Sequence, residues 1–241
     1  MLIAITHINE NLGKVITMKT VEKLKSQEAS RSIVYRRLAD AFRLPETDLS
    51  TVLDELESAL GRLDSNAFDD VARLKQSYID DSAIRPLEID YTGLFVGPFL
   101  VPAPPYGSIY LEDKRQLMGD STIDARQHYL SLGLDLSPDF KEAPDHISAE
   151  LEFMRVLISR ALEAIDTADQ QLLSDNIHHQ RTFLEKHLGS WIPIFTGKVI
   201  EHARTDYYRH LATVTRTFVA EEMDALADPP VAQTAEAREE T

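Results

Sequence analysis

Asp145 and His146, with Ser148 two residues further on, are the residues of this chain whose types and spacing come closest to a catalytic group. A histidine oriented by a carboxylate acts as a general base in many hydrolases, and a neighbouring serine is the usual nucleophile. Consecutive residues at the start of a helix diverge by about 100° each, however, and no Gly-x-Ser-x-Gly turn surrounds Ser148. We therefore expect recognition here, and a hydrolase that uses His146 is the least favoured alternative.

The role of this group within a binding protein stays open from the residues alone. Asp145 or Ser148 is placed to cap the helix that follows, because Asp and Ser accept hydrogen bonds from the free N–H groups of a first turn. In that case His146 bonds a nearby carbonyl or carboxylate group. A polar contact from this group to a bound ligand is an equally supported interpretation, and the two are compatible.

The remaining polar patterns predict no catalytic residue, no metal ion and no cofactor. His178 and His179 are adjacent and point apart on a helix, and His187 follows eight residues later. His202 and Asp206, four residues apart, predict an exposed ion pair on one helix face. The chain has no cysteine and only 9 scattered glycines, which excludes thiolate ligands and glycine-rich phosphate loops.

Aromatic residues and prolines are concentrated between residues 90 and 110. The aromatic residues are Tyr91, Phe95, Phe99, Tyr106 and Tyr110, and the prolines are Pro98, Pro102, Pro104 and Pro105. Aromatic residues at helical spacing usually belong to a core, whereas a segment that prolines hold extended cannot turn all of its side chains inward. The sequence thus leaves open a core role and a half-exposed platform for an apolar peptide.

Hydrophobic periodicity predicts helices in nearly all of the chain outside these loops. The first is expected from Val21 to Leu44 and ends at Pro45. The second is expected from Leu49 to Leu60, with Thr47 or Asp48 as N-cap and Gly61 as its end. The third is expected from Phe68 to Ile79. Pro86 is expected to begin an irregular middle segment. A short helix through Tyr91, Leu94 and Phe95 then stops at Gly97.

Four more helices are predicted beyond the proline-rich segment. The first begins at Ser121 and Asp124, which have capping-box spacing, and ends at Gly133. After a loop between Pro138 and Pro144, one apolar face from Ile147 to Ile165 predicts the longest helix. The last two are expected over 170–188 and 194–226, on either side of a break at Ser190–Pro193. No strand pattern of useful length occurs. We expect an all-α fold, a single compact bundle with proline-rich central loops.

The expected domain is one helical unit over residues 19–227. Residues 1–18 are left as an uncertain N-terminal extension, since Met18 is a second candidate start, and residues 228–241 are predicted to be a disordered acidic tail. Leu2–Ile5 is followed at once by polar residues, so no secretory signal is predicted.

Composition narrows the range of partners. The net charge of -15 disfavours nucleic acid and anionic membranes, because both are bound by clusters of Lys and Arg. The same charge would attract a basic partner. No apolar run approaches the ~20 residues of a membrane span, so we expect no membrane insertion and a cytoplasmic location.

Three ordered blocks of the sequence resemble the TorD/DmsD family of redox-enzyme maturation chaperones. They are Asp90–Pro98 (DYTGLFVGP) with Ala103–Tyr106 (APPY), Pro144–His146 (PDH) followed by Glu150–Met154, and Phe183–Leu188 leading through Trp191 to Ala203–Tyr208. The resemblance spans about residues 25 to 225. It departs from the family at Asp90, where the family usually has Glu, a change that keeps the carboxylate.

The resemblance implies a cytoplasmic chaperone that binds the twin-arginine signal peptide of a molybdopterin-dependent oxidoreductase. Such a chaperone holds the apoenzyme until its cofactor is inserted and prevents premature export. The chain's acidity and its apolar loops agree with a ligand that carries two arginines followed by an apolar segment. The client enzyme itself cannot be named from the sequence.

The residues expected to contact the signal peptide follow from the matching blocks and from the neighbouring carboxylates. They are Asp90, Tyr91, Leu94, Phe95, Pro104, Pro105, Tyr106, Pro144, Asp145, His146 and Glu150. We expect Asp145, with Asp90 or Glu150, to meet the arginines. A helical adaptor for a folded partner is the main alternative. A monomer is the default expectation, and the family's domain-swapped homodimer is the other state considered.

Overall fold

Helices make up most of the chain in this computed structural model, which describes residues 18–45, 49–78, 81–98, 101–112 and 118–227. In chain order they are α1 (Met18–Ala41), α2 (Leu49–Leu63), α3 (Phe68–Ser77), η1 (Asp81–Ala83), α4 (Ile84–Tyr91), η2 (Thr92–Val96), α5 (Ser108–Leu111), α6 (Asp120–Ser131), α7 (Ile147–Asp166), α8 (Gln170–Lys186), α9 (Leu188–His202) and α10 (Asp206–Ala227). Among the described residues no strand forms, which confirms the all-α prediction.

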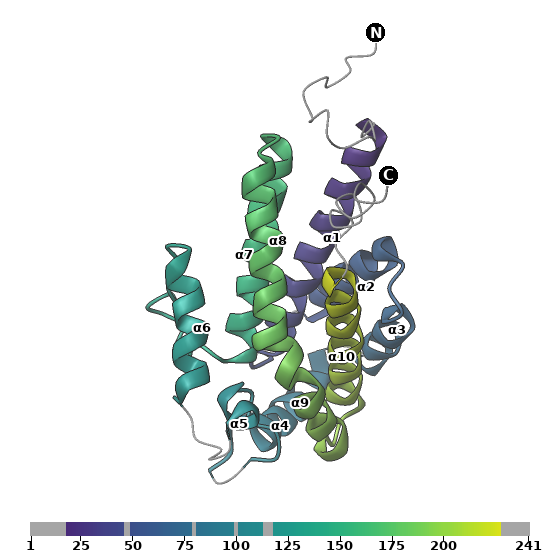
Figure 1. Cartoon of the computed structure of the whole chain (residues 1–241). Coiled ribbons are helices and arrows are strands. Elements are labelled where there is room, and N and C mark those ends of the chain that lie inside the picture. Colours follow the sequence, from purple (N-terminus) through teal and green to yellow (C-terminus); the bar gives the residue numbers. More distant parts are fainter. Residues whose placement is uncertain (1–17, 46–48, 79–80, 99–100, 113–117, 228–241) are drawn as a thin grey trace, which may run out of the picture.

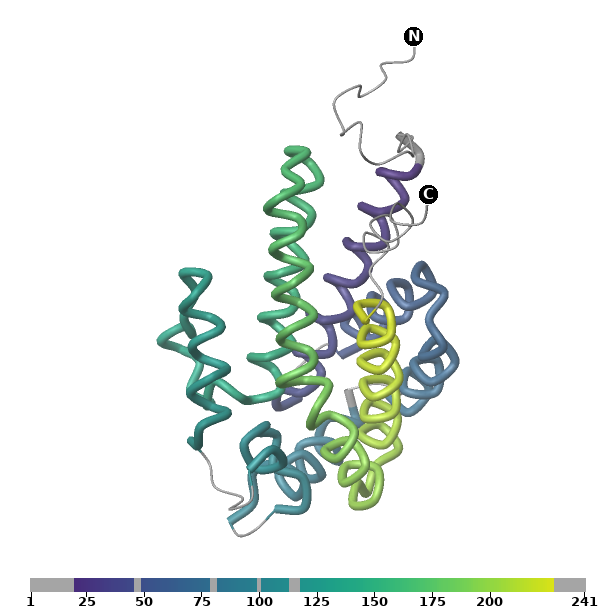
Figure 2. The backbone as a smooth tube through the Cα atoms, in the orientation of Figure 1, coloured from purple at the N-terminus to yellow at the C-terminus, as the bar shows by residue number. Residues whose placement is uncertain are grey.

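The long helices lie side by side around the core. α1 packs against α2 and α7, α7 packs against α8, and α10 packs against α3 and α9. Figure 1 shows α4, α5 and α9 gathered at one end of the bundle and α6 at its edge. In Figure 2 the last helix, α10, lies beside the early helix α3, so the two ends of the described chain share one core.

Large aromatic side chains fill the centre of this core. The largest fully buried ones are Trp191, Tyr35, Tyr207, Tyr208, Phe42, Phe183, Phe195 and Phe218. Phe95 packs edge-on against Tyr208, with ring centroids 5.6 Å apart, and lies near Phe42 and Phe195 at 6.3 and 6.0 Å. Such edge-to-face and tilted pairs add stabilisation beyond the buried area itself.

The helices with the clearest apolar faces form where the sequence predicts them. In α7 the predicted face is buried from Ile147 through Leu151 and Met154 to Ile158. Residues of α2 and α3 follow the same rule, although Gly61 lies within α2 rather than stopping it. The predicted N-caps Thr47 and Asp48, the end of the third helix at Ile79, and the segments before Met18 and after Ala227 lie outside the described residues.

Two predicted boundaries in the first half of the chain are wrong. Pro86 lies within α4, at its third residue, where the missing N–H would have no partner inside the helix anyway. α6 begins after Gly119 without a side-chain cap, and Ser121 instead donates its hydroxyl to Glu112 Oε1 at 2.6 Å. The predicted end at Gly133 is confirmed, because this glycine follows the end of α6 with a positive φ of 70°.

The predicted break at Ser190–Pro193 is also wrong, because these residues lie in the first turns of α9. The chain breaks instead at His187, between α8 and α9, and again between His202 and Asp206. His202 and Asp206 are therefore on different helices and form no shared face. His202 Nε2 lies 3.7 Å from Glu201, and Asp206 pairs with Arg209. Pro193 is the sixth residue of α9 and lies inside the helix, so it removes one hydrogen bond within α9 and does not mark a boundary.

No helix in the part of the chain that the structure describes has both the length and the hydrophobicity required to cross a membrane.

Asp90 explains why the late break occurs where it does. Its carboxylate accepts hydrogen bonds from the backbone N–H of Arg204 at 3.0 Å and of Thr205 at 2.7 Å, and from the Thr205 hydroxyl at 2.7 Å. These donors precede the first turn of α10. The buried Asp90 of α4 therefore acts as a long-range cap that joins the middle of the chain to its last helix.

We predict that Asp90→Ala destabilises the protein by about 2 kcal/mol or more, because it leaves these donors without a partner. Urea unfolding measures the loss. The matched control is Asp206→Ala, which removes an exposed carboxylate from the first turn of α10 and should cost less than about 0.5 kcal/mol. Equal losses in the two variants would contradict the capping role.

Candidate functional site

The proline-rich loop is joined to the start of α7 by backbone hydrogen bonds. Ile147 N–H donates to the Pro105 carbonyl at 3.0 Å, and Gly107 N–H donates to the Asp145 carbonyl at 2.9 Å. The Asp145 carboxylate accepts from Ser108 N–H at 2.8 Å. The loop has few donors of its own because of its prolines, so this pairing fixes its position.

His146, and neither Asp145 nor Ser148, caps α7. Its Nδ1 accepts a hydrogen bond from Ser148 N–H at 3.2 Å, while Asp145 binds the proline loop. The Ser148 hydroxyl donates to the Ala39 carbonyl of α1 at 3.1 Å and is buried. Because this serine is engaged away from His146, no nucleophile and base are paired here, and the hydrolase alternative loses its motive.

An exposed rim forms beside this cap. The Tyr106 hydroxyl donates to the carboxylate of the exposed residue Glu142 at 2.5 Å, and the Tyr106 ring packs edge-on to His146 at 5.2 Å. Burial, and after it the charge of Glu142, raises the pKa of the half-buried Tyr91. Tyr91, Tyr106 and Glu142 thus form a partly exposed tyrosine–carboxylate rim, with the exposed Arg43 near His146.

The other side of the proline loop is hollow. A cavity of about 400 Å³ is lined by Val101, Pro102, Pro104, Ile109, Tyr110, Lys198 and His202. Tyr110 holds its wall, because its hydroxyl donates to the Pro104 carbonyl at 2.8 Å and its ring stacks on Trp191 at 5.7 Å. We call this the proline hollow; its walls are mainly apolar, with two basic groups from α9.

Glu150 is fully buried behind the proline loop. Its Oε2 accepts from the Trp191 indole N–H at 2.9 Å, while its Oε1 has no hydrogen-bond partner among the described residues. Burial raises the pKa of Glu150 well above its usual value, against the effect of the Trp191 bond and with the nearby Asp145 adding to the rise.

The expected peptide contacts divide into two groups. Tyr91, Pro104 and Tyr106 are partly exposed, whereas the other predicted residues are buried: Asp90, Leu94, Phe95, Pro105, Pro144, Asp145, His146 and Glu150. The burial of the three carboxylates is at odds with their expected direct contact with arginines, since each lies under other groups of the chain. The sequence could not separate these groups, because the buried residues contact segments that are distant in the chain, such as Asp90 with Thr205, Asp145 with Ser108 and Glu150 with Trp191.

Three residues of this region escaped the sequence analysis, namely Glu142, Ile109 and Lys198. Glu142 had a detectable signal, as a charged residue within a loop bounded by two prolines. Lys198 had none, since only the folding of α9 against the proline loop brings it there.

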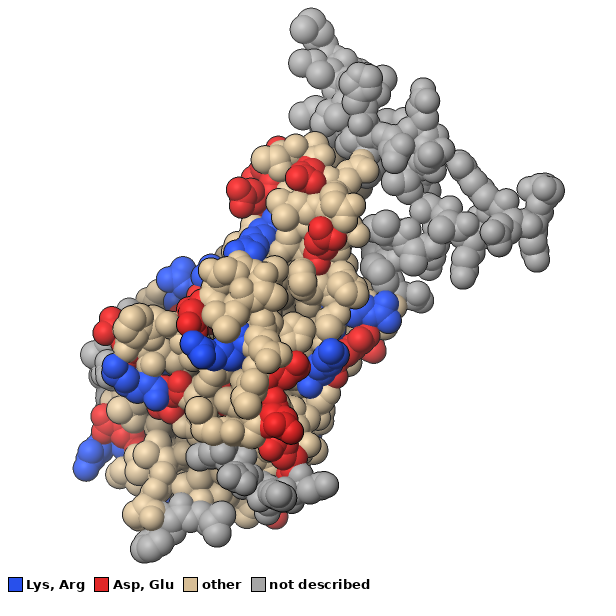
Figure 3. Space-filling view, turned by 60° about the vertical axis from the view of Figure 1, so that its left-hand side comes forward, with Lys and Arg blue, Asp and Glu red and all other residues tan. Residues whose placement is uncertain are grey.

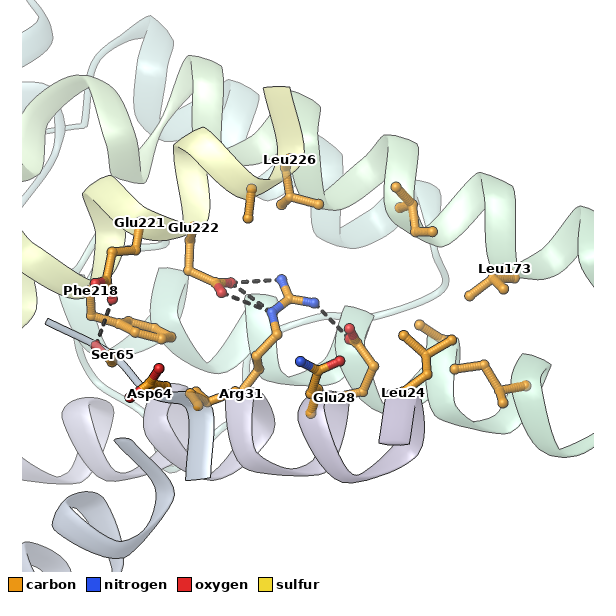
Figure 4. Close-up of a pocket in the computed structure, with 16 residues that line it drawn as sticks. Leu24, Glu28, Arg31, Asp64, Ser65, Leu173, Phe218, Glu221, Glu222 and Leu226 are labelled. Carbon is orange, nitrogen blue, oxygen red and sulfur yellow. Dashed lines mark hydrogen bonds and ion pairs between the residues drawn. The ribbon is translucent and has the colours of Figure 1, made fainter. Parts of the chain in front are cut away.

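A second cavity, of about 470 Å³, lies between α1, α7, α8 and α10. Arg31 binds Glu222 with two nitrogens at 2.6 to 3.0 Å and also contacts Glu28 and Gln180 at 2.6 and 2.9 Å. Figure 4 shows this ion cluster in the cavity, with Leu173 and other apolar side chains toward one end. These acids already bind the chain's own arginine, so we interpret the cluster as a link between helices.

The surface charge is mixed on the side of the molecule shown in Figure 3. Acidic and basic side chains lie interspersed there, separated by uncharged surface. On this face the acidic residues are therefore spread over the surface and do not form one acidic patch.

The fold and these surfaces describe a helical protein with an apolar hollow and a carboxylate rim on either side of its proline loop. Comparison with known proteins gives the family. The protein-family model described as "Nitrate reductase delta subunit" matches residues 46–197. The chain belongs to this family, which is the TorD/DmsD family of chaperones for molybdoenzyme maturation; its members are not enzymes.

Two relatives illustrate the match. "Chaperone protein TorD" of Psychrobacter sp. (strain PRwf-1) is 29% identical over 225 residues, 88% of this chain and 98% of the relative. "Tat proofreading chaperone DmsD" of Salmonella typhi is 29% identical over 160 residues, 66% of this chain and 69% of the relative. The resemblance inferred from the three sequence blocks is thereby confirmed.

A solved structure of a putative redox enzyme maturation protein from Archaeoglobus fulgidus is also similar, with a TM-score of 0.45 and 22% identity, covering 84% of this chain and 94% of that one.

We predict that His146→Asn removes a pH-dependent loss of stability. Burial lowers the pKa of His146 from 6.5 to about 4, with Arg43 adding to the effect and Glu142 and Asp145 opposing it. The unfolded chain therefore gains a proton near pH 6.5 while the folded chain does not, and the wild-type protein loses roughly 3 kcal/mol as the pH falls through this window.

Asn accepts the same capping bond without titrating, so the variant should keep this stability at low pH. Urea unfolding of both proteins at pH 7.5 and 4.5 gives the comparison. The same pH dependence in wild type and variant would show that His146 is not the titrating group.

Proposed function

We propose that this chaperone binds the twin-arginine signal peptide of a molybdopterin-dependent oxidoreductase at the proline loop and its rim. Its relatives named DmsD are Tat proofreading chaperones, which supports this ligand. The observation that carries the proposal is the exposed carboxylate of Glu142, which accepts a hydrogen bond from Tyr106. Tyr106 lies on the same proline-rich loop that lines the proline hollow. A signal with arginines and an apolar segment matches these two surfaces.

In this proposal Glu142 is the direct partner of an arginine. Its carboxylate is exposed, and the hydrogen bond from Tyr106 orients it while leaving acceptor positions free. An arginine guanidinium forms charge-assisted bonds with such a group, and the flanking rings of Tyr91 and Tyr106 offer faces for stacking. Arg43 lies close by and weakens the attraction, although it is paired with Asp40 at 3.5 Å.

The apolar part of the signal occupies the proline hollow. Pro102, Pro104 and Ile109 supply walls that lose little conformational freedom on binding, since prolines and the Tyr110–Trp191 stack hold them in place. The charged Lys198 at this end would repel arginines. It therefore favours one orientation, in which the arginines lie toward Glu142 and the apolar residues lie toward α9.

The buried members of the predicted site then act as positioning residues. Asp145 and His146 hold the proline loop and the first turn of α7, and Asp90 holds the start of α10. Leu94 and Phe95 form the apolar floor below Tyr91. Pro105 and Pro144 supply carbonyls to Ile147 and Tyr129, which fasten the two loops to neighbouring helices.

Such binding belongs in the cytoplasm, because the signal must be covered before export. The partner is the apo form of the client enzyme, whose cofactor is inserted while the signal is held. A monomer is sufficient for this function, since one chain carries both the rim and the hollow.

We predict that Glu142→Gln weakens binding of a synthetic twin-arginine peptide about tenfold. The probe carries two consecutive arginines followed by an apolar segment, and calorimetry with the full chain measures the affinity. Loss of a charged hydrogen bond corresponds to roughly 1.5 kcal/mol or more. Asp139→Asn, which removes an exposed charge from the same loop, is the matched control and should bind within about twofold of wild type.

A second peptide, with both arginines replaced by glutamine, makes this test specific. It should bind wild type and Glu142→Gln equally, because the interaction under test is absent from both complexes. A tenfold difference that persists with this peptide would exclude Glu142 as the arginine partner.

We also predict that Ile109→Ser weakens the same peptide about tenfold, because it removes apolar contact inside the proline hollow. The control is Ile123→Ser, which changes a 55% exposed isoleucine of α6 and should leave binding unchanged. Calorimetry again gives both values. If Ile109→Ser binds as wild type does while Glu142→Gln does not, the apolar segment lies elsewhere.

A further inference from the structure

Three potential metal ligands meet where α6 approaches the junction of α8 and α9. Asp124 and His128 are four residues apart on one face of α6, and His187 lies between the two later helices. Asp124 Oδ2 is 3.0 Å from His187 Nε2 and 3.7 Å from His128 Nε2. The ligand atoms of all three residues lie within 4.8 Å of one another.

This geometry suits a small divalent ion. Ligands bound at about 2.0–2.2 Å to a tetrahedral ion are separated by roughly 3.3 Å, so small side-chain rotations bring these atoms to coordinating distance. The side chains are graded in exposure, from 47% for Asp124 to 17% for His128 and 2% for His187, which leaves an entry path from the α6 side.

A second observation comes from the buried side of His187. Its Nδ1 has no hydrogen-bond partner among the described residues, and neither has Oε1 of Glu150, which lies 3.8 Å away. An ion at Nε2 would place the ring hydrogen on Nδ1, and a small movement of either side chain would bring Glu150 Oε1 within hydrogen-bond distance of it. Metal-bound histidines commonly donate in this way to a carboxylate, which fixes the ring and strengthens its bond to the metal.

We propose that Asp124, His128 and His187 form a binding site for a divalent transition-metal ion of the zinc class, with Glu150 as the acceptor behind His187. Two imidazoles and one carboxylate are borderline ligands that suit Zn²⁺ and leave a fourth position for water. The ion would fasten α6, which lies at the edge of the bundle in Figure 1, to the α8–α9 junction. None of the three proposed ligands, Asp124, His128 and His187, is among the proposed peptide contacts.

The test is zinc binding to the full chain, freed of any affinity tag and treated with a chelator. Competition with a chromophoric chelator should give one Zn²⁺ per chain, and Co²⁺ in its place should give the visible absorption of a tetrahedral ion. Asp124→Asn and His128→Gln change partly exposed side chains and should each weaken Zn²⁺ at least tenfold. His178→Gln, which removes an exposed imidazole from α8, is the matched control and should bind as wild type does.

Two further readouts separate a site from a structural role of these side chains. Added Zn²⁺ should raise the melting temperature of wild type and of His178→Gln, but not of His128→Gln. Glu150→Gln should weaken binding less than loss of a ligand does, while keeping the acceptor for Trp191. The proposal is overturned if wild type binds no zinc, or if His128→Gln and Asp124→Asn bind it with wild-type affinity and the same cobalt spectrum.

Discussion

The pairing between the proline loop and the start of α7 is the contact on which the rest of the candidate site depends. A segment rich in prolines can form neither a helix nor a ladder of its own, so its position must come from another element. Here Pro105, Gly107 and Ser108 bond to the backbone or carboxylate of Asp145 and its neighbours. The rim around Tyr106 and the proline hollow lie on the two sides of the loop that this pairing holds.

Charge in this protein serves two different purposes. Asp90 and Asp145 are buried and accept backbone hydrogen bonds, and the buried Glu222 binds Arg31; each of them joins segments that are distant in the sequence. A carboxylate that is bonded in this way fixes the relative positions of the segments it joins, but few of its acceptor positions remain free for a ligand. In the proposed function, recognition of a basic peptide falls to an exposed group such as Glu142, which the Tyr106 hydroxyl orients without burying it.

Helices with strong periodicity were predictable, whereas several of the caps and breaks were not. The apolar face of α7 follows from the spacing of Ile147, Leu151 and Met154, since burying that face requires a helix. The end of α9 at Ala203 has no local signal, because the cap that stabilises the next helix is Asp90, more than a hundred residues earlier. Pro193 was misleading for a different reason, because a proline usually ends or precedes a helix, whereas here it lies inside α9.

The sequence by itself determined the helical class and the family, because periodicity and short motifs are properties of neighbouring residues. Only the tertiary structure decided which motif residues face outward. Tyr106 and Asp145 belong to adjacent motifs, yet one is partly exposed and the other is fully buried. The meeting of Asp124 with His187 was likewise decided by packing. Exposure and long-range contacts depend on how distant helices pack, and local sequence carries no record of that packing.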